Sequence, residues 1–204
     1  MSTLILIRHG KSQWNSENRF TGWVDIPLSE PGRKEATIAG QRLAARGVHV
    51  DRAFTSTLQR AIETGRIVLD ELGQSDLEQV EAWELNERFY GALTGRDKAQ
   101  TAEEFGEEQV RIWRRSYDIP PPGGESLADT GRRALPYFHN TIIPATREVG
   151  TVMVAAHGNS LRAIMKDLEG ISDADIVALE VATGVPIVYE LDGGSVIGKE
   201  VLDS

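Results

Sequence analysis

The chain has 204 residues, of which 40% are hydrophobic and 26% charged, a composition typical of an ordinary globular protein with a sizeable core. Its formal net charge of −9 argues against non-specific binding to nucleic acid or to an anionic membrane, because both need a basic face. No apolar run approaches the ~20 residues of a membrane-spanning helix. The absence of cysteine excludes disulfides and thiolate chemistry. Because the first strand begins almost at the N-terminus, leaving no room for a signal peptide, we expect a cytoplasmic protein.

One local pattern occurs twice in the chain. Residues 4–12 read Leu-Ile-Leu-Ile-Arg-His-Gly-Lys-Ser, and residues 152–160 read Val-Met-Val-Ala-Ala-His-Gly-Asn-Ser. A continuous apolar run that ends at glycine is typical of a strand buried on both faces of a parallel sheet. Ligands of such sheets gather outside the carboxyl ends of the strands. The pattern therefore predicts that His9 and His157 face one crevice.

The first half of the chain alternates strands with helices. Residues 12–23 are polar and aromatic without a period, which indicates an ordered loop over the strand end. Ser29 and Pro31 begin a predicted helix that ends at Gly47. A strand at 53–55, a helix over 58–72 and a strand near 77–80 follow. This alternation predicts an α/β fold, a three-layer sandwich with a mostly parallel central sheet flanked by helices.

Residues 84–125 differ in character from the rest. Their first part has no simple period, residues 97–117 are helical and strongly charged, and a Pro-Pro-Pro-Gly-Gly run at 120–124 then breaks the chain. Long insertions of this kind usually serve function. We therefore expect one domain over 1–204 with a lid-like helical subdomain inserted at about 84–125.

The C-terminal part continues the α/β pattern. A helix is predicted from Ser126 towards Glu148, kinked or divided at Pro136. The second His-Gly strand comes next, followed by helical segments over 161–179 and a strand over 185–191. Because Pro186 lies early in that strand, we expect the strand at an edge of the sheet.

Two histidines at one strand edge indicate either a metal site or nucleophilic chemistry. Metal binding is disfavoured because neither histidine has a second ligand at helical i, i+4 spacing and there is no cysteine. A neutral imidazole can instead attack phosphorus and form a phosphohistidine. Arg8 beside His9 would disfavour the imidazolium and keep the nucleophile unprotonated.

Phosphoryl transfer also needs cations and a proton donor. Candidate cations are Arg8, Arg60 just after the second strand, and the Arg114-Arg115 pair, with His157 as a further candidate. Glu87, in an irregular loop, is the candidate general acid for a leaving alkoxide. The alternative for Glu87 is a surface carboxylate paired with a neighbouring arginine.

These residues belong to a longer ordered set of motifs. The set comprises Arg-His-Gly-x-Ser-x-Trp-Asn (8–15), Phe-Thr-Gly-Trp (20–23), Leu-Asn-Glu-Arg-x-Tyr-Gly (85–91), Trp-Arg-Arg-Ser-Tyr-Asp (113–118), Ala-Ala-His-Gly-Asn-Ser-Leu-Arg (155–162) and residues 168–175. It resembles the 2,3-bisphosphoglycerate-dependent phosphoglycerate mutases of the histidine phosphatase superfamily. The pattern departs from the family at Lys11 and Gln13, and at the direct passage from Pro122 to Gly123, where many relatives carry an extra stretch.

The resemblance implies a reaction and a role for each site residue. It implies interconversion of 3-phosphoglycerate and 2-phosphoglycerate, primed by 2,3-bisphosphoglycerate, without a metal and commonly in a homodimer. His9 would be the phosphorylated nucleophile, Glu87 the proton donor and acceptor, and His157 a stabiliser of the phosphoryl group. The phosphoryl pocket would be lined by Arg8, Asn15, Arg60, Gly158 and Asn159. The substrate's carboxylate and second phosphate would be held by Ser12, Thr21, Gly22, Arg88, Tyr90, Lys98, Arg114 and Arg115.

Two other functions fit the same residues. One is a broad-specificity histidine phosphatase that hydrolyses phosphomonoesters, and the other is a non-catalytic protein that binds phosphorylated ligands. Lys98 with Arg114 and Arg115 favours the mutase, because simple hydrolysis does not require a second anion clamp.

Overall fold

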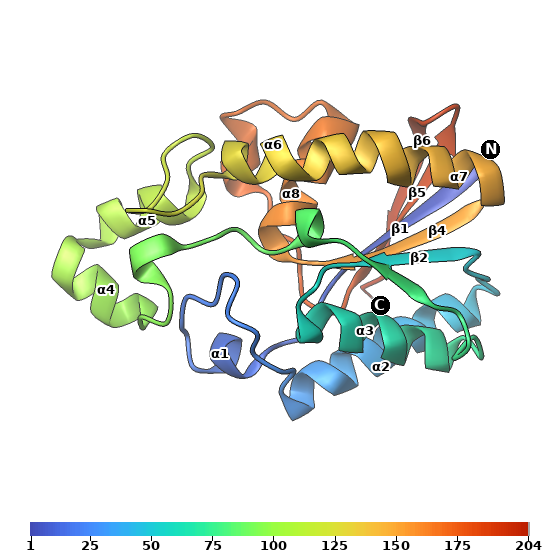
Figure 1. Ribbon diagram of the computed structural model, residues 1–204, viewed down its shortest axis with the longest axis horizontal. Helices are drawn as coiled ribbons and strands as arrows, with labels where there is room; N and C mark the ends of the chain where they lie inside the picture. Colours follow the sequence, from blue (N-terminus) through green and yellow to red (C-terminus); the bar gives the residue numbers. More distant parts are fainter. Residues whose placement is uncertain (204) are drawn as a thin grey trace.

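The computed structural model describes residues 1–203, which form a central sheet with helices on both sides (Figure 1). The strands are β1 (Ser2–Arg8), β2 (Arg52–Thr55), β3 (Gln79–Glu81), β4 (Thr151–Ala156), β5 (Pro186–Asp192) and β6 (Ser195–Val201). The α-helices are α1 (Gln13–Ser16), α2 (Glu30–Ala45), α3 (Gln59–Glu71), α4 (Lys98–Phe105), α5 (Glu107–Arg115), α6 (Leu127–Tyr137), α7 (Ile143–Val149) and α8 (Gly158–Glu169). Short 3-10 turns cover Trp83–Leu85, Gly91–Leu93 and Asp175–Ala178, and a π turn covers Phe138–Ile142.

The sheet has the strand order β3-β2-β4-β1-β5-β6. Strands β3, β2, β4 and β1 are mutually parallel, and β5 runs antiparallel to β1. The register pairs Ile7 with Ala155 and Arg8 with Ala156. The residues that follow, His9 and His157, therefore leave two adjacent strands at the same level of the sheet. The sequence prediction that both histidines lie at one edge is confirmed.

Alternation along the strands divides the core into two layers. Leu4 and Leu6 pack with residues of α7 and α8, whereas Ile5 and Ile7 pack on the opposite face with residues of α2 and α3. In Figure 1, α6, α7 and α8 lie above the sheet and α2 and α3 below it. The predicted three-layer α/β sandwich with a mostly parallel sheet is confirmed. Within residues 1–203, no helix is long and apolar enough to cross a bilayer.

The helix boundaries follow the capping signals. The Ser29 side chain accepts a hydrogen bond from the Gly32 amide at 3.2 Å, with Pro31 in the first turn of α2, as predicted. Ser126 begins α6 with a reciprocal capping box to Asp129. Pro136 is accommodated inside α6, and the helix then widens into a π segment and continues as α7 without a break, so the predicted helix is distorted just after this proline and not interrupted.

The predicted position of β5 at the sheet edge is wrong. Strand β6 pairs along the outer side of β5 and forms the edge itself. Pro186 is tolerated because it is the first residue of β5, where its missing N–H removes no bond from the middle of the ladder.

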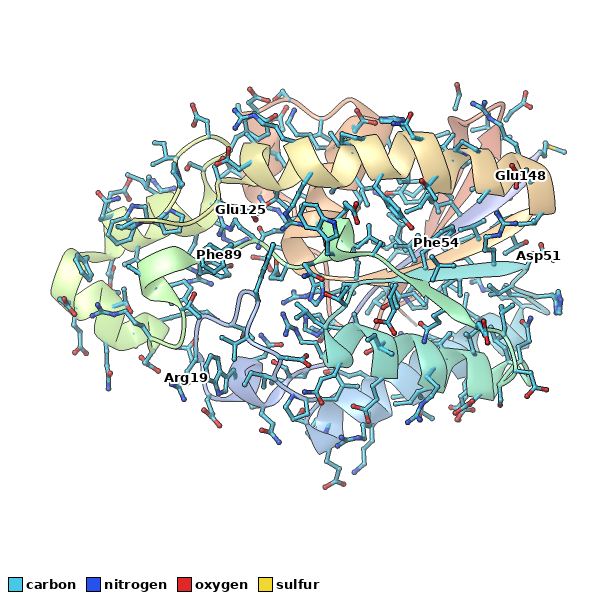
Figure 2. All side chains as sticks on the ribbon, viewed as in Figure 1. Arg19, Asp51, Phe54, Phe89, Glu125 and Glu148 are labelled. Carbon is cyan, nitrogen blue, oxygen red and sulfur yellow. The ribbon has the colours of Figure 1, made fainter. Side chains whose placement is uncertain are left out.

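Helices α4 and α5 lie beyond the carboxyl ends of the parallel strands, at the left in Figure 1. They pack, through Ala102 of α4 and Val110 and Trp113 of α5, on a small apolar cluster with Phe20 and Leu93 that is separate from the two layers of the main core. In Figure 2, Arg19, Phe89 and Glu125 lie at this end of the molecule, whereas Asp51 and Glu148 lie at the other. The limits 84–125 for a subdomain stay a prediction.

Candidate active site

His9 is held at the carboxyl end of β1 with a defined ring orientation. Its amide donates to the Ala156 carbonyl at 2.9 Å, and its Nδ1 lies 2.7 Å from the Gly10 carbonyl oxygen. A carbonyl only accepts, so Nδ1 carries the hydrogen and Nε2 keeps a free lone pair. Burial, and then the charges of Arg60 and Arg8, hold the pKa of His9 well below its ordinary value of 6.5. The ring is therefore unprotonated at neutral pH, and its Nε2 is chemically able to act as a nucleophile.

Gly10 is required by the close approach of this strand end to α2. A Cβ atom at Gly10 would lie 2.1 Å from the Gly32 carbonyl oxygen, and only glycine avoids this steric clash. The Gly10 amide also donates to the Thr64 hydroxyl at 3.0 Å. The backbone that carries His9 is thus anchored to both α2 and α3.

His157 occupies the equivalent position after β4 and is fully buried. Its ring centroid lies 4.9 Å from that of His9, and its Nε2 lies 2.7 Å from the Ser56 hydroxyl. Its Nδ1 is buried without a hydrogen-bond partner among the described residues. Burial, and then the charges of Arg60, His9, Arg8 and Arg133, lower the pKa of His157 well below 6.5. Both histidines are therefore neutral.

Two arginines adjoin the histidine pair. Arg8 donates to the Val181 carbonyl at 2.7 Å. Arg60 is almost fully buried and donates to the carbonyls of Gly22 at 2.7 Å and Val24 at 2.9 Å, so its planar fork holds the 22–24 loop over the site. Burial lowers the pKa of Arg60 to about 10, which still leaves it charged at neutral pH.

Glu87 lies beside the start of α8, next to the strand end that carries His157. Its Oε1 accepts from the Arg88 amide at 2.7 Å, the Asn159 amide at 3.1 Å and Asn159 Nδ2 at 3.0 Å. Its Oε2 lies beside Gly158, 3.7 Å from where a Cβ of that glycine would be. One carboxylate oxygen is therefore saturated with donors, and the other is left to exchange a proton.

The loop that carries Glu87 is held from outside by Arg133 of α6. Its guanidinium donates to the carbonyls of Glu84 at 2.7 Å, Asn86 at 3.0 Å and Glu87 at 2.8 Å. Trp23 Nε1 donates to the same Glu87 carbonyl at 2.6 Å. An irregular segment is thereby fixed without regular secondary structure.

His9, Arg8, Arg60 and Glu87 border a cavity of about 250 Å³, a size that suits a metabolite. Seven cationic side chains and only two carboxylates line the cavity, although the chain as a whole carries a net charge of −9. The cations are Arg8, Arg19, Arg60, Lys98, Arg114, Arg115 and Arg162, and the carboxylates are Glu87 and Glu180. The cavity is therefore built for a multiply charged anion.

Most of the predicted site residues line this cavity. They are His9, Glu87, Arg8, Arg60, Asn15, Thr21, Gly22, Tyr90, Lys98, Arg114, Arg115, Gly158 and Asn159. Three do not line it. His157 lies buried beside His9, Ser12 is the buried N-cap of α1, and Arg88 lies buried against the ring of Tyr90, with its Cζ 4.8 Å from the ring centroid.

The sequence reasoning missed several lining residues. They are Arg19, Phe20, Arg162, Leu179, Glu180 and Val181. It also missed Ser56, the partner of His157. Phe20 begins the Phe-Thr-Gly-Trp motif, Arg19 directly precedes it, and Arg162 ends the second His-Gly motif, so the motifs were an available signal for these three. The segment 179–181 has no such signal.

No group of three or more His, Asp or Glu side chains that could hold a metal ion occurs in residues 1–203. The cations that surround the cavity come from arginine and lysine. The charge of a bound anion is therefore met by guanidinium and ammonium groups.

Paired strand-end histidines in an arginine-rich cavity define a class of phosphoryl-transfer proteins, and the comparisons agree. The family model described as histidine phosphatase superfamily (branch 1) matches residues 4–201, and the chain belongs to this superfamily. It is 56% identical over 200 residues to the 2,3-bisphosphoglycerate-dependent phosphoglycerate mutase of Parvibaculum lavamentivorans, covering 98% of this chain and 95% of the relative. It is 54% identical over 202 residues to the phosphoglycerate mutase of Schizosaccharomyces pombe, covering 98% and 96%.

The fold is also similar to that of a solved phosphatase. A mycobacterial glucosyl-3-phosphoglycerate phosphatase in complex with VO3 superimposes with a TM-score of 0.82 at 26% identity, covering 93% of each chain. The resemblance predicted from the sequence motifs is confirmed by the mutase relatives and the superfamily match.

Proposed function

We propose that this protein is a 2,3-bisphosphoglycerate-dependent phosphoglycerate mutase, which interconverts 3-phosphoglycerate and 2-phosphoglycerate. The observation that carries the proposal is that one cavity with seven cations holds both an unprotonated His9 and Glu87, whose Oε1 accepts hydrogen bonds while Oε2 stays free. The high identity to mutases over nearly the whole chain supports the same reaction.

In the proposed reaction His9 accepts and returns the phosphoryl group, and Glu87 transfers the proton. In priming, His9 Nε2 attacks one phosphorus of 2,3-bisphosphoglycerate; an N–P bond forms, the ester P–O bond breaks, and Glu87 Oε2 gives its proton to the leaving alkoxide. In turnover, the deprotonated Glu87 takes the proton of the free hydroxyl of 3-phosphoglycerate, and the hydroxyl oxygen attacks the phosphohistidine; an O–P bond forms, the N–P bond breaks, and His9 becomes free again. The bisphosphate then reorients and returns its other phosphoryl group to His9, which releases 2-phosphoglycerate.

The surrounding groups stabilise the transferred phosphoryl group. Arg8 and Arg60 are the positive charges that act on His9, and they would offset the negative charge on the equatorial oxygens of the phosphoryl group. If the Ser56 hydroxyl donates to His157 Nε2, the unpartnered Nδ1 of His157 carries a hydrogen and donates to a phosphoryl oxygen. A bound phosphate thus satisfies a buried donor.

A second group of cations serves the other end of the ligand. Lys98, Arg114 and Arg115 come from α4 and α5, which lie beyond the strand ends (Figure 1). They would hold the carboxylate and the second phosphate while the bisphosphate reorients. A phosphatase for simple monoesters has no need of this second clamp, so its presence favours the mutase over the hydrolase.

The same proposal covers the cofactor, assembly and compartment. The priming donor is 2,3-bisphosphoglycerate, and the chemistry needs no metal, because arginine and lysine supply the positive charge. Phosphoglycerates are the small anionic partners. We propose a homodimer in the cytoplasm, by analogy with the family.

Two measurements test the proposal. Isomerisation of 3-phosphoglycerate should depend on catalytic amounts of 2,3-bisphosphoglycerate, and intact mass should show an acid-labile phosphate adduct that His9→Ala abolishes. The matched control is His139→Ala, which removes a half-exposed histidine outside the cavity and should retain the adduct. Hydrolysis of many phosphate esters without isomerisation would establish the phosphatase instead, and ligand binding without an adduct would establish a binding protein.

A further inference from the structure

We propose that Arg162 is a positioning residue for Glu87, because it fixes the orientation of the Asn159 side-chain amide and thereby determines which oxygen of Glu87 carries the proton. The role of Glu87 as the general acid rests on the proposed function. The positioning itself rests on the contacts of α8 and the Glu87 loop.

Arg162 lies one helical turn after Asn159 on α8 and is only 5% exposed. Its Nη1 donates to Asn159 Oδ1 at 3.1 Å, and its Nη2 donates to the Ile176 carbonyl at 2.6 Å. Two anchors fix a planar guanidinium in place. A guanidinium only donates, so the oxygen and not the nitrogen of the Asn159 amide must face it.

The amide orientation determines the donors on Glu87. With Oδ1 facing Arg162, Nδ2 points to Glu87 Oε1 at 3.0 Å and lies 3.3 Å from the Tyr90 hydroxyl. The main-chain amides of Arg88 and Asn159 complete the set of donors on Oε1. An oxygen that accepts three hydrogen bonds has no room for a proton. The exchangeable proton is therefore placed on Oε2, beside Gly158.

A buried charge that made no specific contribution would be a net cost to the fold. Burial lowers the pKa of Arg162 to about 10, so the side chain keeps its charge at neutral pH despite this cost. Replacing it with lysine would keep the charge, but one ammonium group cannot reproduce both anchors of the fork. The structure therefore assigns to Arg162 a geometric contribution that charge alone does not supply.

The test compares two phosphate donors in single-turnover phosphorylation of His9, followed by rapid quench and intact mass. With 2,3-bisphosphoglycerate the leaving alkoxide needs the proton of Glu87, whereas the p-nitrophenolate of p-nitrophenyl phosphate leaves without protonation. We expect Arg162→Met to slow phosphorylation by the bisphosphate by at least about tenfold, which is part of the rate enhancement that a general acid provides. Phosphorylation by the aryl ester should change by less than about twofold. Glu87→Gln should show the same selectivity.

Further variants separate positioning from simple damage. In an Asn159→Ala background, Arg162→Met should cause no additional loss with the bisphosphate, because the two residues act in series. Arg162→Lys, which keeps the charge, should fall between wild type and Arg162→Met. Arg111→Met, which removes an exposed arginine paired with Glu108, should change neither reaction.

Equal slowing with both donors, full additivity with Asn159→Ala, or no slowing at all would overturn the inference. These outcomes are distinct from failure of the proposed function. A wild-type protein that is phosphorylated on His9 with the same donor selectivity, but does not isomerise phosphoglycerate, would refute the mutase and leave the role of Arg162 intact.

Discussion

The imidazole rings of His9 and His157 lie with their centroids 4.9 Å apart and their planes inclined by 59°. Both rings are buried, and Arg60 and Arg8 add positive charge around them. A positive charge on either ring would be repelled by these arginines and poorly solvated. The pair is therefore kept neutral by its surroundings, and this has consequences for both catalysis and stability.

The neutral pair makes the protein sensitive to acid. Each folded-state pKa lies below 6.5, the value expected in the unfolded chain, so below pH 6.5 the unfolded state binds more protons. The free energy of unfolding should therefore fall as pH drops from about 6.5, by up to about 1.4 kcal/mol per pH unit for each histidine. Urea unfolding at pH 7.0, 6.0 and 5.5 measures this slope.

Two histidine variants isolate the source of the slope. His9→Asn should be less sensitive to pH than wild type, whereas His139→Asn, at an exposed position, should keep the full slope. Apart from Asp167, which pairs with His139, the titrating carboxylates are common to all three proteins and cancel in the comparison. An unchanged slope in His9→Asn would show that the buried pair does not control acid sensitivity.

Ser56 is the partner of His157, and its removal should impair both the site and the fold. In Ser56→Ala, both ring nitrogens of His157 lack a hydrogen bond, at a cost of about 1–3 kcal/mol in stability. We expect kcat to fall by roughly tenfold with little change in KM, because in the proposed mechanism the ring stabilises the phosphoryl group in transfer and not the bound substrate. Steady-state kinetics and thermal unfolding measure the two effects.

The exposed Ser75 supplies the control for that variant. Ser75→Ala should match wild type in both measurements. A rise in KM at constant kcat in Ser56→Ala would instead indicate that His157 contributes to ground-state binding.

The pairing of His9 with His157 could be predicted from the sequence, because each histidine directly follows an apolar run that forms a strand of the sheet. Two apolar runs that end in His-Gly predict adjacent strand ends, and the register of β1 with β4 places His9 and His157 together. The tautomer of His9 could not be predicted, because it depends on a 2.7 Å contact with the carbonyl of Gly10. Atomic contacts of this kind leave no periodic signal.

The edge strand and the polar supports were harder to predict for different reasons. Strand β6 reads Ser-Val-Ile-Gly-Lys-Glu-Val and lacks the strict alternation of a half-buried strand, although the Asp-Gly-Gly-Ser run at its start was an available hairpin signal. Arg133 and Arg162 lie on helices, where an arginine usually faces solvent. Only the packing of α6 and α8 shows that these two guanidinium groups point inward to the Glu87 loop and Asn159.

Lys98 should make anion binding weaken in alkaline solution. Burial, and then the charges of Arg114 and Arg8, lower its pKa to about 8, so the free protein loses this positive charge as pH rises through 8. A phosphate ester is already fully ionised there, since its second pKa is about 6. The Kd for 3-phosphoglycerate should therefore rise by about tenfold between pH 7 and 9.

Calorimetry on a His9→Ala background, which prevents turnover, measures that dependence. In Lys98→Arg the side chain keeps its charge between pH 7 and 9, so most of the pH dependence of Kd should disappear. Persistence of the full dependence in Lys98→Arg would assign it to another group.

Glu180 is the carboxylate that opposes anion binding at the mouth of the cavity. It forms an ion pair with Arg115, and both side chains line the cavity. Glu180→Gln removes the competing negative charge, and an exposed pair of this kind is worth about 0.2–1 kcal/mol. We expect the Kd for 3-phosphoglycerate to fall by about two- to fivefold, with a larger gain for the more highly charged bisphosphate and a smaller one in 0.5 M salt. Glu104→Gln, which breaks the exposed pair with Arg96 outside this cavity, should leave both affinities unchanged. Weaker binding in Glu180→Gln would show instead that the carboxylate is needed to orient Arg115 towards the ligand.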